Sequence, residues 1–365
     1  MEITKEAVLK ALSTVEEPDL KKDLVTLNMV KDVVVKGDQV EFTVVLTTPA
    51  CPLKELIRKR CEDAIRIGIG VAVKVVVNMT AEVTSLNVGS ANLKNIKNIV
   101  AIASGKGGVG KSTVASNLAI ALAQTGARVG LIDADIYGPS MPVMFGLEDA
   151  RPGVVDEDGK NWVIPLQKYG VQLMSIGFLT PADSAVIWRG PMASSALKQF
   201  FNDVKWPELD YLLIDLPPGT SDIHLTMVQS VPVTGALIVT TPQKVAIADA
   251  QKGVAMFKQA QINVPLLGLV ENMAYFTPAE LPDNKYFIFG EGGGQELADR
   301  FKMPVLGQIP LVQSIRESGD KGVPAVLNDD ITANAFKKLA ENVAQQIAIR
   351  NASSEESKKV EITEY

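Results

Sequence analysis

Short apolar runs alternate with helix-forming stretches along most of the chain. From about residue 98 the runs read "NIVAIAS", "ARVGLIDAD", "VQLMSIG", "DYLLIDLPPG", "TGALIVTTP", "PLLGLVENM" and "PVLGQIP". Strands that are apolar throughout and separated by helices are typical of a parallel sheet with both faces covered. The pattern therefore predicts an α/β domain over residues 98–350, with a mostly parallel sheet and helices on both faces.

The beginning of the chain carries a different pattern. An amphipathic helix is expected near residues 3–14 and a second helix from Pro52, with the apolar runs "KDVVVKG", "VEFTVVLTT" and "VAVKVVVNMTAEV" around them. These elements predict a small α+β domain over residues 1–83. The polar stretch "SLNVGSANLKNIKN" lacks either hydrophobic period and indicates a linker over residues 84–97. The polar end, residues 351–365, indicates a mobile tail.

Composition narrows the class of protein. The 365 residues carry a net charge of −6, which argues against a general nucleic-acid binder because such a protein needs a basic face. The longest apolar stretches are far shorter than the ~20 residues that cross a bilayer, and no export signal is visible. Only two cysteines occur, so a disulfide framework is not expected. We expect a cytoplasmic protein that binds neither nucleic acid nor membrane.

A glycine-rich turn, "GKGGVGKST", follows the first apolar run of the larger domain and precedes a helix. It matches G-x-x-x-x-G-K-[ST], in which backbone N–H groups and the helix N-terminus converge on phosphate oxygens. Lys111 is expected to contact the β- and γ-phosphates of ATP, and Ser112 to bind Mg²⁺. The motif predicts that the whole loop binds the nucleotide: Gly105, Lys106, Gly107, Gly108, Val109, Gly110, Lys111, Ser112 and Thr113.

Aspartates end two of the later strands. "LIDADIYGPS" contains Asp133 and Asp135, and "YLLIDLPPGTSD" contains Asp215 followed by Gly219. Ligands of open parallel sheets bind at the carboxyl ends of the strands, so Asp135 and Asp215 are candidate Mg²⁺ ligands and Gly219 a γ-phosphate sensor. Asp133 could also reach the ion or position water, and the alternative for either residue of the first pair is a structural strand-end or turn role.

The loop has one more lysine than phosphate binding needs. Lys106 completes K-G-G-x-x-G-K-[ST], which resembles the deviant Walker A loop of dimeric ATPases such as nitrogenase reductase and the septum and partition ATPases. The resemblance implies a homodimer in which Lys106 reaches the partner's nucleotide and acts in catalysis together with Asp135 and Asp215. The alternative is that Lys106 is a solvated loop charge.

Several longer stretches resemble one family within this class. "GKGGVGKSTVASNLA", "DADIYGPSMPVMFG", "WRGPM", "DYLLIDLPPGTSD" and "VENMAYF" are similar to the Mrp family of iron–sulfur cluster carrier ATPases over residues 95–345. "EEPDLKKDLVTLNMVKDVVV" and "LTTPACPLKELI" resemble the iron–sulfur assembly domain often fused to them. The resemblance implies an ATPase that transfers clusters to apoprotein clients, and it assigns Asn272 to the adenine edge. A turn role is the alternative for Asn272.

The chain departs from this family at one point. Members usually carry a C-x-x-C pair after the "ENM" strand, and two copies supply four thiolates to a cluster. Here the stretch reads "ENMAYFTPAELPDNKYFIFGEGGG", and no cysteine follows Cys61. Cys51, placed before a helix and near basic residues, is the remaining candidate for a labile iron–sulfur cluster, with a buried turn cysteine as the alternative. Cys61 lies at the spacing of an apolar helix face and is expected in the core.

These observations leave more than one function open. The first is a cluster carrier that hydrolyses ATP, and the second is a cluster-free, ATP-dependent scaffold or regulator of cluster assembly. A positioning ATPase would need a basic or amphipathic C-terminal helix, which the sequence does not show. An electron-transferring reductase would need bridging cysteines in the ATPase domain. His224, the only histidine, is expected to cap a helix or lie on the surface.

Overall fold

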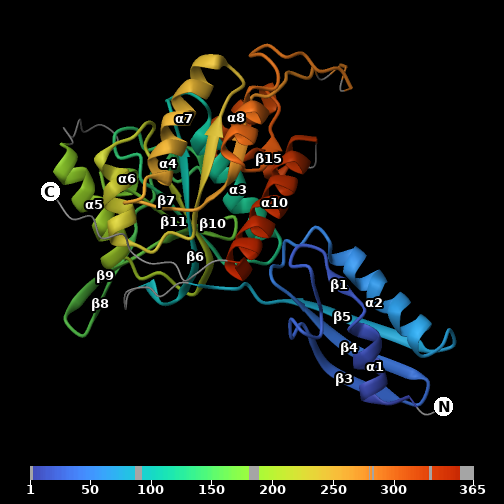
Figure 1. The fold of residues 1–365 in the computed structure, drawn as a ribbon. Helices are drawn as coiled ribbons and strands as arrows, with labels where there is room; N and C mark the ends of the chain where they lie inside the picture. The colour runs from blue at the N-terminus through green and yellow to red at the C-terminus, as the bar shows by residue number, and fades with distance from the viewer. Residues whose placement is uncertain are drawn as a thin grey trace. The chain divides into compact units, whose positions relative to one another are not determined.

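The computed structural model describes residues 3–86, 93–180, 189–278, 280–281, 283–328 and 331–353 of the chain. It divides into two compact units, one built mainly from Met1–Thr84 and the other from Ser85–Ile347 (Figure 1). The part of the "WRGPM" motif before Arg189 lies outside the described residues, as do residues 354–365 of the predicted tail.

The first unit packs two helices on a three-stranded sheet. The sheet order is β3-β4-β5, with β3 antiparallel and β5 parallel to the central strand. In β4 every second residue is buried, among them Phe42, and α2 buries Ile57, Cys61 and Ile65 at four-residue spacing. The elements are α1 (Lys5–Leu12), β1 (Glu16–Glu17), β2 (Lys22–Asp23), β3 (Val30–Lys36), β4 (Gln39–Leu46), α2 (Lys54–Gly68) and β5 (Lys74–Ala81).

The second unit is built on an eight-stranded sheet in the order β10-β11-β7-β12-β6-β13-β14-β15. Only β10 runs antiparallel to its neighbour, so the prediction of a mostly parallel sheet is confirmed. The strands of this sheet are β6 (Ile96–Ser104), β7 (Val129–Asp133), β10 (Leu166–Lys168), β11 (Val171–Ser175), β12 (Leu209–Asp215), β13 (Gly235–Thr240), β14 (Leu266–Glu271) and β15 (Val305–Gln308). A separate hairpin pairs β8 (Gly153–Glu157) with β9 (Lys160–Ile164).

Helices lie on both faces of this sheet. Side chains of α5, α6, α7 and α8 share one hydrophobic core with residues of the strands, and α3 packs on β6, β7 and β12. The helices are α3 (Lys111–Gln124), α4 (Met141–Met144), α5 (Gly190–Asn202), α6 (Asp222–Ser230), α7 (Lys244–Lys258), α8 (Gly293–Phe301), α9 (Gln313–Asp320) and α10 (Ile331–Ser353), with 3-10 turns η2 (Ile176–Phe178) and η3 (Ala325–Leu327).

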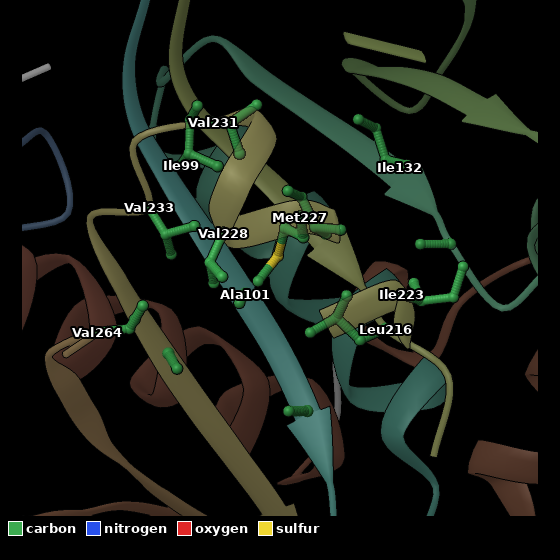
Figure 2. Packing of buried hydrophobic residues seen from close by; sticks show 14 of the residues in the cluster. Ile99, Ala101, Ile132, Leu216, Ile223, Met227, Val228, Val231, Val233 and Val264 are labelled. Carbon is green, nitrogen blue, oxygen red and sulfur yellow. The ribbon is translucent and has the colours of Figure 1, made fainter. Parts of the chain in front are cut away.

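The core fixes where each strand ends. Figure 2 shows Met227 of α6 beside Ala101 of β6, with Val228 and Ile99 close by. Every residue of β12 is buried, down to Asp215 at its end. Burying a large apolar side chain contributes about 1.5–3 kcal/mol, so sliding such a strand by one residue would be costly. The acidic strand ends are therefore held at a defined height at one edge of the sheet.

Several predicted boundaries differ from the structure. The second helix begins at Lys54 rather than Pro52, and the first spans Lys5–Leu12 rather than 3–14. Strand β6 begins at Ile96, and Leu93, which lay within the predicted linker 84–97, is 1% exposed in the core of the second unit. Residues 87–92 of that linker lie outside the described residues. Helix α10 continues to Ser353, past the tail boundary predicted at residue 351.

Candidate nucleotide-binding site

The glycine-rich loop joins the end of β6 to the start of α3. Gly108 and Gly110 have φ angles of 80° and 78°, in the left-handed region that favours glycine. Gly110 is also the N-cap of α3, which begins at Lys111 as the motif predicts. The free N–H groups of the first helical turn therefore face the loop, which is the arrangement that binds phosphate in other proteins.

Close packing holds the loop at both of its ends. A Cβ atom on Gly105 would lie 2.1–2.2 Å from backbone atoms of Asp249 and Ala250 in α7, where no room exists. A Cβ on Gly110 would lie 2.2 Å from Nδ2 of Asn272. A Cβ on Gly107, in contrast, would meet only Pro218, at 3.9 Å. The glycines at 105 and 110 thus serve the packing of the loop as well as its conformation.

Lys111 and Asp215 form a buried ion pair, which the sequence motifs do not predict. Lys111 Nζ lies 2.6 Å from Asp215 Oδ1, and the two residues are 6% and 0% exposed. Asp215 Oδ2 is buried and has no hydrogen-bond partner within the described part of the chain. Removing one member of a buried pair leaves an uncompensated charge and costs about 3–5 kcal/mol. Lys111, predicted to face the phosphates, and Asp215, predicted to bind Mg²⁺, therefore also stabilise the fold.

Asp133 holds the segment that follows β7. Its Oδ2 atom accepts hydrogen bonds from Ser140 N, Met141 N and Ser175 Oγ at 3.0–3.2 Å, and Oδ1 accepts from Asp135 N at 3.3 Å. Burial, and then the charge of Asp215, raise the pKa of Asp133 to about 7. With both oxygens engaged in this way, the structural alternative for Asp133 is the one that the geometry favours.

Two adjoining cavities lie over the loop. The smaller, about 260 Å³, is lined by Ser104, the loop residues 106–113, Asp135, Gly138, Ser140, Met144 and Pro218. The larger, about 490 Å³, is lined mainly by apolar residues, including Val143, Met273 and Leu311. Gly110, Thr113, Ser140 and Met144 contribute to both cavities. A polar compartment next to an apolar one suits a ligand with a phosphate end and an aromatic end.

Asp135 and Ser112, the residues expected to bind Mg²⁺, both line the smaller cavity. Burial is the largest cause that raises the pKa of Asp135, and the positive charge of Lys111 opposes it. Hydroxyl and carboxylate oxygens are the protein ligands that Mg²⁺ prefers, and nucleotide phosphates and water supply the remaining ones. Together with the unpartnered oxygen of Asp215, these groups fit a Mg²⁺ ion bound with a nucleotide.

Asn272 lines the larger cavity, as expected for a residue near the base. It is 5% exposed, and its Nδ2 atom donates a hydrogen bond of 2.8 Å to the carbonyl oxygen of Val109. This contact with the loop was not predicted. The contact with adenine stays a prediction, and the structure adds that the same amide fixes the loop.

The turn after β12 is hydrogen-bonded to Ser104, the residue before the loop. Gly219 has a φ of 84°, and its N–H donates to Ser104 O at 2.9 Å. His224 completes a capping box with Ser221 at the start of α6, which confirms the capping role. The alternative of a surface position is excluded, because His224 is 1% exposed, and burial lowers its pKa to about 4. The turn is therefore held by an uncharged imidazole at neutral pH.

The cysteines behave differently from each other. Cys61 is 0% exposed and burial raises its pKa to about 12, so its core position is confirmed. Cys51 is half-buried. It was expected directly before a helix that begins at Pro52, but α2 begins at Lys54, so two residues separate Cys51 from the helix. Within the described residues, no group of three or more His, Cys, Asp or Glu side chains could hold a metal ion. A cluster would thus need ligands from outside this set.

None of the helices in the described part of the chain combines the length and the apolar character that a membrane span requires.

A glycine-rich loop between a parallel strand and a helix, with buried aspartates at the next strand ends, defines a P-loop nucleotide-binding protein. The chain belongs to the ParA family described as NUBPL iron-transfer P-loop NTPase, whose model matches residues 95–347. A second family model, described as iron–sulfur cluster assembly protein, matches residues 5–78. The predicted resemblance and fold class are thereby confirmed.

Relatives with this organisation cover nearly the whole chain. A protein named iron-sulfur cluster carrier protein from Synechocystis sp. is 50% identical over 348 residues, which is 95% of this chain and 97% of that protein. The protein of the same name from Escherichia coli is 41% identical over 344 residues, 93% of this chain and 91% of its own length. A nucleotide-binding protein from Archaeoglobus fulgidus, solved in complex with ADP, is 40% identical, with a TM-score of 0.56 over 65% of this chain and 92% of that chain.

Proposed function

We propose that this chain is an iron–sulfur cluster carrier that binds and hydrolyses ATP and delivers clusters to apoprotein targets. The observation that carries the proposal is the loop itself, with Lys111, Ser112 and Asp135 lining one cavity and Asp215 bound to Lys111. The 50% identical relative named as a carrier matches both units, which supports the same task for this chain.

The nucleotide part of the proposal follows from the loop. Backbone N–H groups of residues 107–113 would bind the phosphates, and Lys111 would neutralise their charge. Ser112, Asp135 and Asp215 would hold a Mg²⁺ ion, which polarises the phosphate oxygens when bound. The apolar cavity beside Asn272 would take the adenine ring. We expect hydrolysis to be slow, because Lys106 is proposed to assist catalysis only after two chains have formed a homodimer.

Lys106 supports the proposed homodimer. The residue lines the phosphate cavity and is partly exposed, so its ammonium group can extend toward a second copy of the chain. A cation placed on the partner's phosphates would stabilise the charge that develops during phosphoryl transfer. The dimer would therefore form with nucleotide bound and bring two carrier units together.

The cluster is cargo in this proposal and need not have a complete site in one chain. Cys51 is the candidate thiolate, and a dimer would supply two copies of it. Four thiolates hold a stable [4Fe–4S] cluster, so any cluster here would be labile and completed by ligands of the client or of assembly proteins. The reducing cytoplasm, which we include in the proposal, would keep the thiol available.

Anaerobic reconstitution with iron and sulfide tests the cargo part. The full chain, Cys51→Ser and Cys61→Ala are compared, because Cys61 is the matched cysteine that lies buried in the core. We expect iron that a chelator removes easily in the full chain and in Cys61→Ala, and none in Cys51→Ser.

The second candidate is a cluster-free, ATP-dependent scaffold, and the absence of cysteine after Cys61 favours it. If the full chain takes up no iron even with an apoprotein client present, the carrier proposal gives way to the scaffold. A tightly held cluster that survives in Cys51→Ser would contradict the assignment of Cys51.

A further inference from the structure

A buried carboxylate beside the nucleotide cavities has no part in the functions proposed so far. Glu271 is the last residue of β14 and is 2% exposed. Its Oε1 atom accepts a 2.7 Å hydrogen bond from Gly294 N, and its Oε2 atom accepts one of 2.8 Å from Gln308 Nε2. A carboxylate removed from water is retained only with such partners, so these contacts are part of the fold.

Glu271, at the end of β14, caps the N-terminus of α8. The N-cap of α8 is Gly292, which has no side chain to accept from the first N–H groups of the helix. Glu271 accepts from the N–H of Gly294 instead, and a negative charge at a helix N-terminus is also favoured by the helix dipole. A Cβ on Gly294 would lie 2.7 Å from Oε1, so the helix start rests directly on the carboxylate.

The residue that follows the strand, Asn272, points at the phosphate loop. Asn272 is the first residue after β14, and its Nδ2 atom donates a hydrogen bond to the carbonyl oxygen of Val109 at 2.8 Å. Its backbone N–H is fixed by Thr240 O at 2.8 Å, and the carbonyl oxygen of Glu271 accepts from Ile309 N at 2.9 Å. The end of β14 thus holds α8 on one side and the loop on the other.

A second route leads from α8 to the opposite end of the loop. A Cβ on Gly293 would lie 2.5 Å from Pro242 O, two residues before α7 begins. The backbone of α7 in turn packs on Gly105. The start of α8 therefore contacts structure that supports both ends of the phosphate loop, Gly105 through α7 and Gly110 through Asn272.

We infer that Glu271 is a positioning residue of the nucleotide site, which sets the geometry of the phosphate loop by fixing the start of α8 to the end of β14. The inference rests on the proposed nucleotide binding and not on cluster transfer. It also implies reciprocity: a ligand that orders the loop must steady the start of α8 by the same contacts.

We call the described residues between β14 and α8, which are 272–278, 280–281 and 283–292, the β14–α8 connection. Phe276 and Tyr286 in it pair through two backbone hydrogen bonds of 2.8 and 2.9 Å, and Leu281 and Ile288 are 50% and 60% exposed. The connection returns to the fold at Gly292, directly before the residues that Glu271 holds.

ADP titration of the full chain tests the inference with three variants. Glu271→Ala should bind ADP about tenfold more weakly or worse, because it removes two charge-assisted hydrogen bonds. Glu271→Gln should stay within about threefold of wild type, since its amide still accepts from Gly294 and a reoriented Gln308 amide can pair with it. Leu297→Ala, which opens a cavity in the core under α8 but removes no hydrogen bond of the carboxylate, should lower the Tm but leave ADP affinity within about threefold.

Hydrogen exchange supplies a readout that a merely structural role would not change. ADP should slow exchange at Gly294 in wild type and in Glu271→Gln, and this slowing should be absent in Glu271→Ala even at saturating ADP. If Glu271→Ala is poorly folded, Gln308→Ala removes only one of the two bonds and should show a smaller loss of affinity in the same direction.

Two results would overturn the inference: unchanged ADP affinity in Glu271→Ala, or an equal loss of affinity in Leu297→Ala at the same fall in Tm. Wild-type chain that binds no ADP would instead refute the proposed nucleotide function, and the inference with it.

Discussion

Replacing Gly105 by alanine tests the packing of the phosphate loop on α7. The added Cβ would lie 2.1–2.2 Å from backbone atoms of Asp249 and Ala250, whereas ordinary contacts begin at 3.4 Å. The loop and the helix must therefore separate by more than 1 Å, and no flexible side chain is present to absorb the change. Overpacking of this kind costs about 1–3 kcal/mol of stability.

The same displacement should weaken nucleotide binding. A shift of 1 Å in a positioned group can cost up to about a hundredfold, so we expect the Kd for ADP to rise tenfold to a hundredfold, about 1.4–2.7 kcal/mol. Calorimetric titration measures it directly. Thermal unfolding gives a second value: ADP at 100 times the wild-type Kd should stabilise wild type by about 2.7 kcal/mol and a hundredfold weaker variant by only about 0.4 kcal/mol.

Gly253→Ala is the matched control in the same helix. Nothing lies within 4 Å of a Cβ at Gly253, and alanine is the better residue inside a helix by about 0.5–1 kcal/mol. The control should keep or raise the Tm and bind ADP as wild type does. Wild-type affinity and stability in Gly105→Ala would show that the loop does not pack on α7 as described.

Distinct outcomes are expected for four further variants. Lys111→Ala should lower ATP affinity at least about tenfold and also destabilise the fold, because Asp215 loses its buried partner. Ser112→Ala should reduce Mg²⁺-dependent hydrolysis more than ATP binding. Titration measures the loss of binding and a turnover assay measures the loss of hydrolysis. Lys106→Ala should bind nucleotide normally but lose ATP-dependent dimerisation and turnover, which light scattering and a phosphate-release assay would show, and wild-type turnover would contradict the dimer proposal. Burial lowers the pKa of His224 from 6.5 to about 4, so between these pH values the unfolded chain binds a proton that the folded chain does not, and the free energy of unfolding falls as the pH falls. His224→Gln should lose less stability over this range, by up to about 3 kcal/mol. Urea unfolding at several pH values measures this, and an equal loss of stability in the two proteins would refute the assignment.

Seven of the eight strands of the large sheet could be predicted, because each is an apolar run. Strand β10 was not predicted, because its three residues, Leu166–Lys168, form no such run. The hairpin of β8 and β9 was also missed. Every residue of β8 is exposed, so the run has no buried face and no hydrophobic period. Its local signal was the turn at Asp158 and Gly159, whose φ angles of 53° and 78° favour such a pair of residues.

The nucleotide site could be predicted only where its residues are close in sequence. The loop motif is local, and it places the start of α3 correctly. The pair of Lys111 with Asp215 joins residues 104 positions apart, and the bond from Asn272 to Val109 joins residues 163 apart. Such contacts depend on strand order and on how far each strand extends, which the hydrophobic pattern does not determine. The sequence therefore predicts which residues meet the ligand, and the fold shows which of them also hold the loop.

Cluster transfer under nucleotide control is the most direct test of the central proposal. The full chain, loaded anaerobically with iron and sulfide, is mixed with a four-cysteine apoferredoxin, and the rate at which the ferredoxin gains its cluster is followed spectroscopically with MgATP, with MgADP and without nucleotide. The proposal predicts transfer from wild type at a rate that changes with MgATP, and in Lys111→Ala transfer at a rate that no longer responds to nucleotide. No transfer from the loaded wild-type chain under any of the three conditions, or an unchanged response to MgATP in Lys111→Ala, would contradict it.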